Sequence, residues 1–575
     1  MPVKPANAEY VCSWYNRLLT QRATWEAIWQ DLADYLTPNK PSIITRRSPG
    51  AKTTDRLFEG TGEKSLRRLS ANMHGSLTSS SLKWFSLKMR DNTLGQSRNV
   101  RMWLEDDVNR MLNAFNQSNF GSEGQELYVD LGGFGTGSMF TEEVTPERSG
   151  VFGGLRFTAL PIGSYVIDED PFGQVDVLMR SMKKSARSLL MQFPDAPFPE
   201  DIKKAAEAQK DVFYEVIHAI YPREGGASTP RTDARELKYA SCYVLRKEKL
   251  LLKESGFHEF PTPTPRWSKM TGEVWGRGPG HLALPDVKTL NRLVELSLKA
   301  AAKAVDPPLM VAHDGIMGGV IRLNPAGITY VRDTESSIKT LPIGTKWDVI
   351  KFEMSELQQA IREAFNVDNL TLKERPQMTA EEVRARIEQM QKDIGPTLGR
   401  IETEFLNPLI SRVFNMMFRS GALLPPPQEV LNAMAQNAGD IDIVFTGQMA
   451  KNQRIGEVYA IRQAYELATV VATARAALPG VDDVFDADEN LSAAALILGV
   501  PEKGVRDPKK VAAIREDRAA ADAEAAQVAQ DRQDAGTMKD MATAEEKMAG
   551  PGRRRITMPP PQDEAAMLSA GGMME

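Results

Sequence analysis

The sequence predicts a mainly α-helical protein with one α+β body, and three observations lead to this class. Apolar residues recur at helical spacing along most of the chain, whereas strand-like alternation is confined to about residues 138–260. A composition of 42% hydrophobic and 26% charged residues is that of an ordinary folded protein. At 575 residues the chain should hold about three or four structural units.

The first quarter of the chain is predicted to be helical. From Asn7 to about Leu36 apolar residues recur every three or four positions, and Pro38 ends the pattern. The same spacing predicts a second helix near residues 66–77 and a third near residues 100–115.

Residues 131–139, LGGFGTGSM, are the first stretch that resembles a phosphate site. Gly132 and Gly137 have the spacing of a P-loop, but Ser138 stands where the lysine is required and Met139 where the hydroxyl is required. A dinucleotide fingerprint fails too, because a helix precedes these glycines and a strand follows them. We therefore expect a helix-to-strand corner that needs positive φ and close packing.

After this corner, the segments QVDVLMRSM, VFYEVIHAI and YASCYVLRK are predicted to be strands. In the first of them, Val175, Val177 and Met179 should share one face because strand side chains alternate.

The next part of the chain predicts two helices that bracket a small β insertion. The first helix starts at Leu284 and ends at Asp306, before two prolines, and the second runs over about residues 348–365. Residues 307–347 between them are short β-prone pieces interrupted by glycine and proline. The first helix carries four bases away from its apolar stripe: Lys288, Arg292, Lys299 and Lys303.

The longest periodic signal begins at Thr379 and ends at Gly421. Pro396 and Pro408 each remove an amide donor within it, so kinks or breaks are expected there. The polar segment 366–378, NVDNLTLKERPQM, precedes this helix and, read alone, indicates a solvent loop. The segment after about residue 505 is rich in Ala, Glu, Gln, Asp and Arg, so it is helix-permissive but is not expected to fold alone.

Charge and sulfur content restrict the function. The chain has 76 acids, 71 bases and a formal charge of -5, so no global positive field holds nucleic acid. Cys12 and Cys242 are the only cysteines, which cannot build a disulfide framework or a thiolate zinc site. We expect synthesis in a reducing compartment and neither a secretory leader nor a membrane span.

No motif predicts catalysis or a cofactor. DADENLSAAALI, from Asp486, begins like a calcium loop, but Leu491 stands where glycine is required and Ile497 where glutamate is required. An acidic helix N-terminus explains this segment better. The five histidines show no metal-ligand spacing, and G-x-S-x-G does not occur. We therefore expect no catalytic residue, no metal and no cofactor.

Several blocks together resemble the portal, or head-to-tail connector, proteins of short-tailed bacteriophages. Their order and spacing over about residues 66–460 carry the resemblance, which does not cover the region after about residue 505. The blocks are LRRLSANMHGSLTSSSLKWFSL (66–87), GFGTGSMF (133–140), VWGRGPGHLALPDVKTLNRLVELSLKAAAKAVDPPLMV (274–311), NPAGI (324–328), RPQMTAEEVRARI (375–387) and LNPLISRVF (406–414).

The resemblance implies a portal fold of wing, stem, clip and crown that assembles as a ring. In this plan the N-terminal helices and α+β wing cover 1–283, and the two stem helices cover 284–306 and 348–365, with the clip between them at 307–347. The tunnel loop covers 366–378, a long wing or crown helix covers 379–421, and the crown covers 422–504. Residues 505–575 are an Ala-rich tail, helical or flexible, for which a barrel is an open alternative.

The resemblance also implies a structural role in the virion. Twelve subunits would form a channel at the unique capsid vertex, through which double-stranded DNA enters during packaging and leaves during ejection, without sequence specificity. The implied partners are the terminase large subunit, which would supply the motor, the major capsid and scaffolding proteins, and tail adaptor or nozzle proteins; synthesis would take place in the host cytoplasm.

The same resemblance gives candidate site residues. Asn369, Lys373 and Arg375 of the tunnel loop become candidates for the DNA channel, and the bases Lys288, Arg292, Lys299 and Lys303 become candidates for contacts between subunits. Two alternatives stay open: a nucleotide-dependent enzyme that uses the glycines of 131–139, and another helical virion or adaptor protein.

Overall fold

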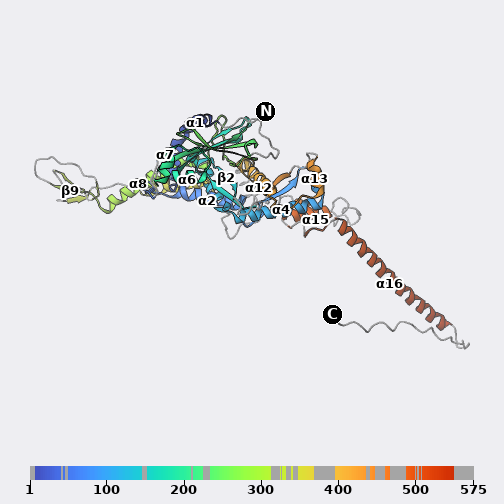
Figure 1. The fold of residues 1–575 in the computed structure, drawn as a ribbon. Helices are drawn as coiled ribbons and strands as arrows, with labels where there is room; N and C mark the ends of the chain where they lie inside the picture. The colour runs from blue at the N-terminus through green and yellow to red at the C-terminus, as the bar shows by residue number, and fades with distance from the viewer. Residues whose placement is uncertain are drawn as a thin grey trace, which may run out of the picture. The chain divides into compact units, whose positions relative to one another are not determined.

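The computed structural model consists of two units, Met1–Glu502 and Lys503–Glu575, each considered by itself (Figure 1). The residues that the structure describes are 7–40, 43–45, 50–144, 152–208, 212–223, 234–312, 324–325, 327–331, 338–340, 347–367, 395–435, 441–446, 460–466, 487–498, 500, 504–506 and 508–548.

Helices dominate the start of the first unit, as the sequence predicts. The helices are α1 (Ala8–Leu36), α2 (Thr61–Leu77), α3 (Asn92–Gln96), α4 (Arg98–Gln117) and α5 (Phe120–Phe134). The side chain of Asn7 caps α1 by accepting from the amide of Glu9 at 2.9 Å, and α1 ends at Leu36, two residues before Pro38.

A five-stranded antiparallel sheet forms the β part of the α+β body. Its order is β4 (Tyr165–Glu169), β5 (Val175–Ser185), β6 (Phe213–Pro222), β7 (Tyr239–Leu245), β8 (Leu250–Phe257), and a separate pair joins β2 (Met139–Glu143) to β3 (Leu155–Ala159). The N-terminal half of α1 packs on one face of the sheet. The short helices α6 (Ala186–Gln192) and α7 (Glu200–Glu207) pack on the opposite face at one end.

The prediction that Val175, Val177 and Met179 share a face is wrong for Val175. Val177 and Met179 pack with α1, but Val175 packs with the main core. The reason is a β-bulge: Asp168 pairs with Val177 and Glu169 pairs with Val175, so Asp176 has no partner position on β4. One extra residue reverses the alternation of side chains.

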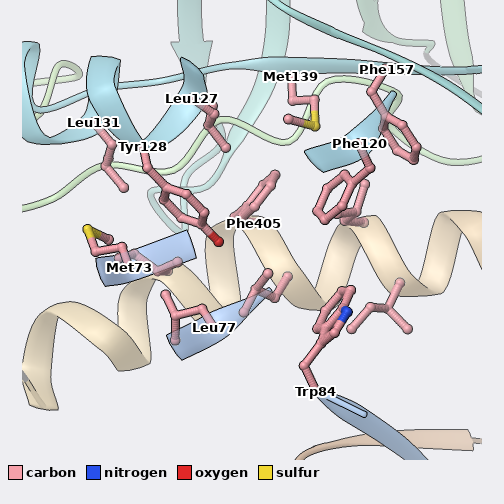
Figure 2. Packing of buried hydrophobic residues seen from close by; sticks show 14 of the residues in the cluster. Met73, Leu77, Trp84, Phe120, Leu127, Tyr128, Leu131, Met139, Phe157 and Phe405 are labelled. Atoms are coloured by element: carbon pink, nitrogen blue, oxygen red, sulfur yellow. The ribbon is translucent and has the colours of Figure 1, made fainter. Parts of the chain in front are cut away.

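The main core joins the N-terminal helices to a distant helical segment. Residues 395–401 are α-helical, Glu402–Leu406 form a π-helical turn (η3), and α12 follows over Asn407–Arg419. Figure 2 shows Phe405 of this turn beside Tyr128 of α5, with ring centroids 6.3 Å apart. The backbone stays helical through Pro408, and the amide of Asn407 donates to the carbonyl oxygen of Glu402, five residues back, in the π-helical pattern. Gly421, with φ +71°, ends the helix as predicted, whereas residues 379–394 lie outside the described part.

Two helices bracket a three-stranded sheet, as the sequence predicts. They are α8 (Pro279–Val305) and α9 (Trp347–Ala364), which contact each other, and the sheet has the order β10 (Ile328–Val331), β9 (Leu309–Ala312), β11 (Ile338–Thr340). We call these two helices and their sheet the arm. Helix α8 starts at Pro279 and not at the predicted Leu284. Proline is tolerated there because the amides of the first helical turn have no acceptor within the helix.

The first unit also contains a strand pair and two short helices. Strand β12 (Ile441–Phe445) pairs antiparallel with β1 (Phe85–Met89), and α13 (Gln428–Ala435) and α15 (Ala487–Leu498) are short helices. In the second unit, α16 (Pro508–Met548) is one largely exposed helix. Among the helices that the structure describes, none is long and apolar enough to cross a membrane.

Candidate functional site

The glycines of 131–139 form the predicted corner between a helix and a strand. Helix α5 ends at Gly135, which has φ +76°, and β2 begins at Met139. This φ lies in the left-handed region, which glycine adopts without steric strain because it has no Cβ atom. The corner is buried from Leu131 to Phe140.

The corner interlocks with a second glycine-rich stretch, residues 276–280. A Cβ on Gly135 would lie 2.4 Å from the amide nitrogen of Gly278, and one on Gly280 would lie 2.3 Å from the carbonyl oxygen of Gly133. Only glycine permits backbones to approach so closely. We call Gly133, Gly135, Gly276, Gly278 and Gly280 the glycine joint. It fixes the first turn of α8 against the end of α5, so two of the blocks that carry the resemblance are one structural feature.

A proline-rich segment, residues 261–265, lies along the outgoing strand of the corner. The amides of Gly137, Met139 and Thr141 donate to the carbonyl oxygens of Pro265, Pro263 and Pro261 at 3.2, 3.2 and 2.9 Å, and the amide of Gly135 donates to Leu131 at 3.0 Å. A phosphate cradle needs free backbone amides that point at the ligand. These amides already have acceptors within the chain, so the glycines are not arranged for a phosphate.

A buried arginine ties four segments together next to the glycine joint. The side chain of Arg266 is fully buried and forms ion pairs with Glu404 at 2.9 Å and with Glu169 at 2.8 Å. Its guanidinium also donates to the carbonyl oxygens of Gly173 and Val274, and its amide donates to Glu404 at 2.9 Å. We call this set the Arg266 clamp. It connects the β4–β5 hairpin, the 267–274 loop and the π-helical turn to the proline-rich segment.

His281 caps the helix that leaves the joint. Its Nδ1 accepts from the amide of Gly278 at 3.2 Å. Burial, reinforced by the charge of Arg277, lowers the pKa of His281 to about 4. The imidazole is therefore neutral at physiological pH and keeps the acceptor that the cap requires.

The arm exposes apolar side chains once it leaves the body. The buried residues of α8 all lie between Pro279 and Asn291, and Figure 1 shows the helix continuing from there toward β9. Leu298 and Val305 of α8 are 55% and 86% exposed, and Phe352 of α9 is 61% exposed. Large exposed apolar residues on two helices that contact each other indicate a surface that another molecule covers.

The four bases predicted for subunit contacts have different surroundings. Lys288 forms an ion pair with Asp31 of α1 at 2.6 Å, so its charge is already used within the chain. Arg292 and Lys299 both bond Glu295 at 2.6 Å. Lys303 lies in the last turn of α8. The three DNA-channel candidates, Asn369, Lys373 and Arg375, lie outside the described residues.

Sequence reasoning missed the residues that organise this region. Arg266 gives no signal in the sequence, because its partners are 97 and 138 positions away. Arg412 gives a weak one, a charge within the apolar stripe of α12; it is buried and donates to the carbonyl oxygen of Thr141 at 3.1 and 3.2 Å. Burial lowers the pKa of Arg412 to about 10. In the part of the chain that the structure describes, no three His, Cys, Asp or Glu side chains gather as a metal site.

Comparisons with known proteins identify the family. The family model described as "Bacteriophage head to tail connecting protein" matches residues 9–505. The "Probable portal protein" of Bordetella phage BPP-1 is 28% identical over 518 residues, which are 88% of this chain and 90% of that protein. The "Portal protein" of Salmonella phage epsilon15 is 29% identical over 514 residues, 88% of this chain and 89% of that protein.

One solved structure is also similar, a chain from the virion of a native gene transfer agent particle. It matches 79% of this chain and 96% of its own length at 11% identity, with a TM-score of 0.35. A score this low supports no conclusion. The family model, in contrast, spans most of the chain, and the chain therefore belongs to the bacteriophage head to tail connecting protein family.

Proposed function

We propose that this chain is the subunit of a portal ring of twelve copies at the unique vertex of a phage capsid. The match to the connector family over residues 9–505 is the observation that carries the proposal, and two relatives named portal proteins support it over 88% of the chain. In this role the ring is the channel through which double-stranded DNA enters and leaves the head. It would dock the terminase large subunit, and then tail adaptor or nozzle proteins, and would contact the major capsid and scaffolding proteins.

The arm supports assembly with further copies. A ring closes through heterologous contacts, in which one surface of a subunit meets a different surface of the next. The exposed apolar side chains of α8 and α9 are suited to such a contact because burial removes them from water. We assign these helices to the stem, with boundaries at 284–306 and 348–365, and the small sheet between them to the clip.

The other domain assignments rest on the same family plan. Residues 1–283 form the wing, 379–421 the long wing or crown helix, 422–504 the crown, and 505–575 the tail. Residues 366–378 form the tunnel loop, so Lys373 and Arg375, with Asn369, approach DNA in the channel.

The charge balance suits a conduit. Each phosphate contact by lysine or arginine strengthens DNA binding and makes it more dependent on salt. A channel lined with bases would therefore retain its cargo, whereas a chain with a formal charge of -5 lets DNA slide.

Imaging of the purified protein tests the ring. We expect negative-stain particles with a central hole and a native mass near twelve times 63.7 kDa. Monomers alone under all assembly conditions would contradict the proposal. A closed particle without a hole would favour the alternative of a helical adaptor protein that does not enclose DNA.

Replacement of Lys373 and Arg375 together by alanine tests the tunnel-loop assignment. We expect rings to form as in the wild type, because the change removes two charges from a segment that the sequence predicts to be a polar loop. Packaging or retention of DNA should change, and the salt dependence of DNA retention should become shallower. Packaging at the wild-type level, with unchanged salt dependence, would refute a role for these two side chains.

A further inference from the structure

The tip of the β4–β5 hairpin presents a phenylalanine to solvent on a rigid support. Phe172 is 91% exposed. The carboxylate of Asp170 accepts from the amides of Phe172 and Gln174 at 2.9 and 2.8 Å, and the amide of Gly173 donates to the carbonyl oxygen of Asp170 at 2.9 Å. The Arg266 clamp holds the same tip through Gly173. A large apolar side chain that is exposed on a hydrogen-bonded turn is typical of an anchor for a partner.

This end of the sheet is acidic. Asp176 is next to Val177, the strand partner of Asp168, and the amide of Asp170 donates to the carbonyl oxygen of Gln174 at 2.8 Å, so the three aspartates belong to one end of one hairpin. Burial, reinforced by the charges of Asp170 and Asp168, raises the pKa of Asp176 to about 6. Bases also lie at this end: Lys269 is paired with Glu169 at 2.6 Å, Arg223 is paired with Glu254 at 2.9 Å, and Lys238 lies over the ring of Tyr239 at 5.4 Å. We call Asp168, Asp170, Asp176 and Phe172 the acidic tip.

The opposite end of the same sheet also exposes apolar side chains, but there bases surround them. Strand β5 has 11 residues, which at roughly 3.3 Å each separate its ends by about 35 Å. At the far end Ser185 pairs with Phe213, which is 64% exposed, and α6 follows with Met191, which is 74% exposed.

The bases at this far end come from two segments. Lys183 and Lys184 lie near the end of β5, Arg187 lies in the first turn of α6, and Arg246, Lys247 and Lys249 lie in the adjoining β7–β8 turn. These six bases outnumber the neighbouring acids Glu9, Glu215 and Glu248. Glu9 is paired with Lys249, and Glu215 is paired with Arg246. Helix α7 adds three acids and two bases. We call Lys183, Lys184, Arg187, Met191 and Phe213 the basic end.

We propose that the acidic tip of one subunit docks on the basic end of the next copy of this chain. The two surfaces have opposite charge, each exposes a large apolar side chain, and they lie at opposite ends of one rigid sheet, which is the arrangement that a head-to-tail contact requires. This inference rests on the proposed ring and names the wing surfaces that meet in it.

Two neutral substitutions test the contact, Phe172→Gln and Phe213→Gln. Both side chains are exposed, so the melting temperature should stay at the wild-type value, and each variant should need at least about tenfold more protein for half-maximal ring formation. Leu491→Gln, at a leucine that is 72% exposed on α15, is the matched control and should assemble like the wild type.

A mixture of the two variants shows whether the contact is head-to-tail. A Phe172→Gln subunit keeps its basic end, and a Phe213→Gln subunit keeps its acidic tip. With one variant isotopically labelled, native mass spectrometry should therefore show mixed pairs about tenfold enriched over the pairs that either variant forms alone. Growth beyond these mixed pairs needs a contact that is altered on one or both sides.

The outcomes separate this inference from the proposed function. Rings of the wild type, together with normal rings of either single variant, overturn the docking assignment and leave the ring intact. Defective single variants without mixed pairs also overturn it, because the two surfaces then do not meet each other. A wild type that forms no ring in the same experiment contradicts the proposed function itself.

Discussion

Replacement of Gly280 by alanine is expected to destabilise the first unit by about 3 kcal/mol or more. The added methyl group would lie 2.3 Å from the carbonyl oxygen of Gly133 and 3.0 Å from its Cα. Both are backbone atoms of a buried helix end, which cannot move aside as a flexible side chain can. The first turn of α8 must therefore shift away from α5, which opens the glycine joint. Chemical denaturation of the purified protein measures the loss.

Gly75→Ala is the matched control for this substitution. Gly75 also lies in a helix, α2, but a Cβ there would have no atom within 4 Å. Alanine in an open helical position stabilises by about 0.5–1 kcal/mol relative to glycine. The two variants should thus change the free energy of unfolding in opposite directions. Equal effects would mean that close backbone approach does not hold the joint.

The corner at residues 131–139 shows how far sequence reasoning reaches. The change from helical to alternating spacing across the glycines predicts the helix-to-strand order, and the missing lysine argues against a phosphate site; the structure agrees with both. The partner of the corner could not be predicted, because Gly278 and the proline-rich segment lie more than 120 positions further along the chain. Local spacing contains no information about such pairings.

Two further features also leave no signal in the local spacing of the sequence. Spacing gave the wrong face for Val175, because a single unpaired residue, Asp176, reverses the alternation and leaves no mark in the sequence. The resemblance to portal proteins makes Lys288 a candidate base for subunit contacts, and that role stays a prediction. The ion-pair partner of Lys288, Asp31, is 257 positions away, so the charge pairing became visible only in three dimensions. The roles of Asn369, Lys373 and Arg375 stay predictions.

Arg266→Met is expected to cost about 3–5 kcal/mol, the range for the removal of one partner from a buried ion pair. Methionine fills much of the volume, but Glu404 loses its cation and keeps only the amide of residue 266 as a donor. Lysine should not rescue the site, because it cannot reproduce the paired bonds of a planar guanidinium. The melting temperature of the first unit, Met1–Glu502, followed by circular dichroism, should fall by roughly 3–5 °C.

The double variant Arg266→Met, Glu404→Gln separates charge from packing. If an unpaired carboxylate is the main penalty, the second substitution should recover part of the loss, since removal of both charges is often far less costly than removal of one. Arg462→Ala, which breaks an exposed ion pair with Glu466, is the control and should change stability by at most about 0.5 kcal/mol. Recovery would show that the Arg266 clamp acts through electrostatics.

The Arg266 clamp also supports the hairpin that carries Phe172. The single variant should therefore assemble less well than its melting temperature alone would predict, and the double variant should regain stability without regaining assembly. Equal recovery of both would mean that the clamp does not position the acidic tip.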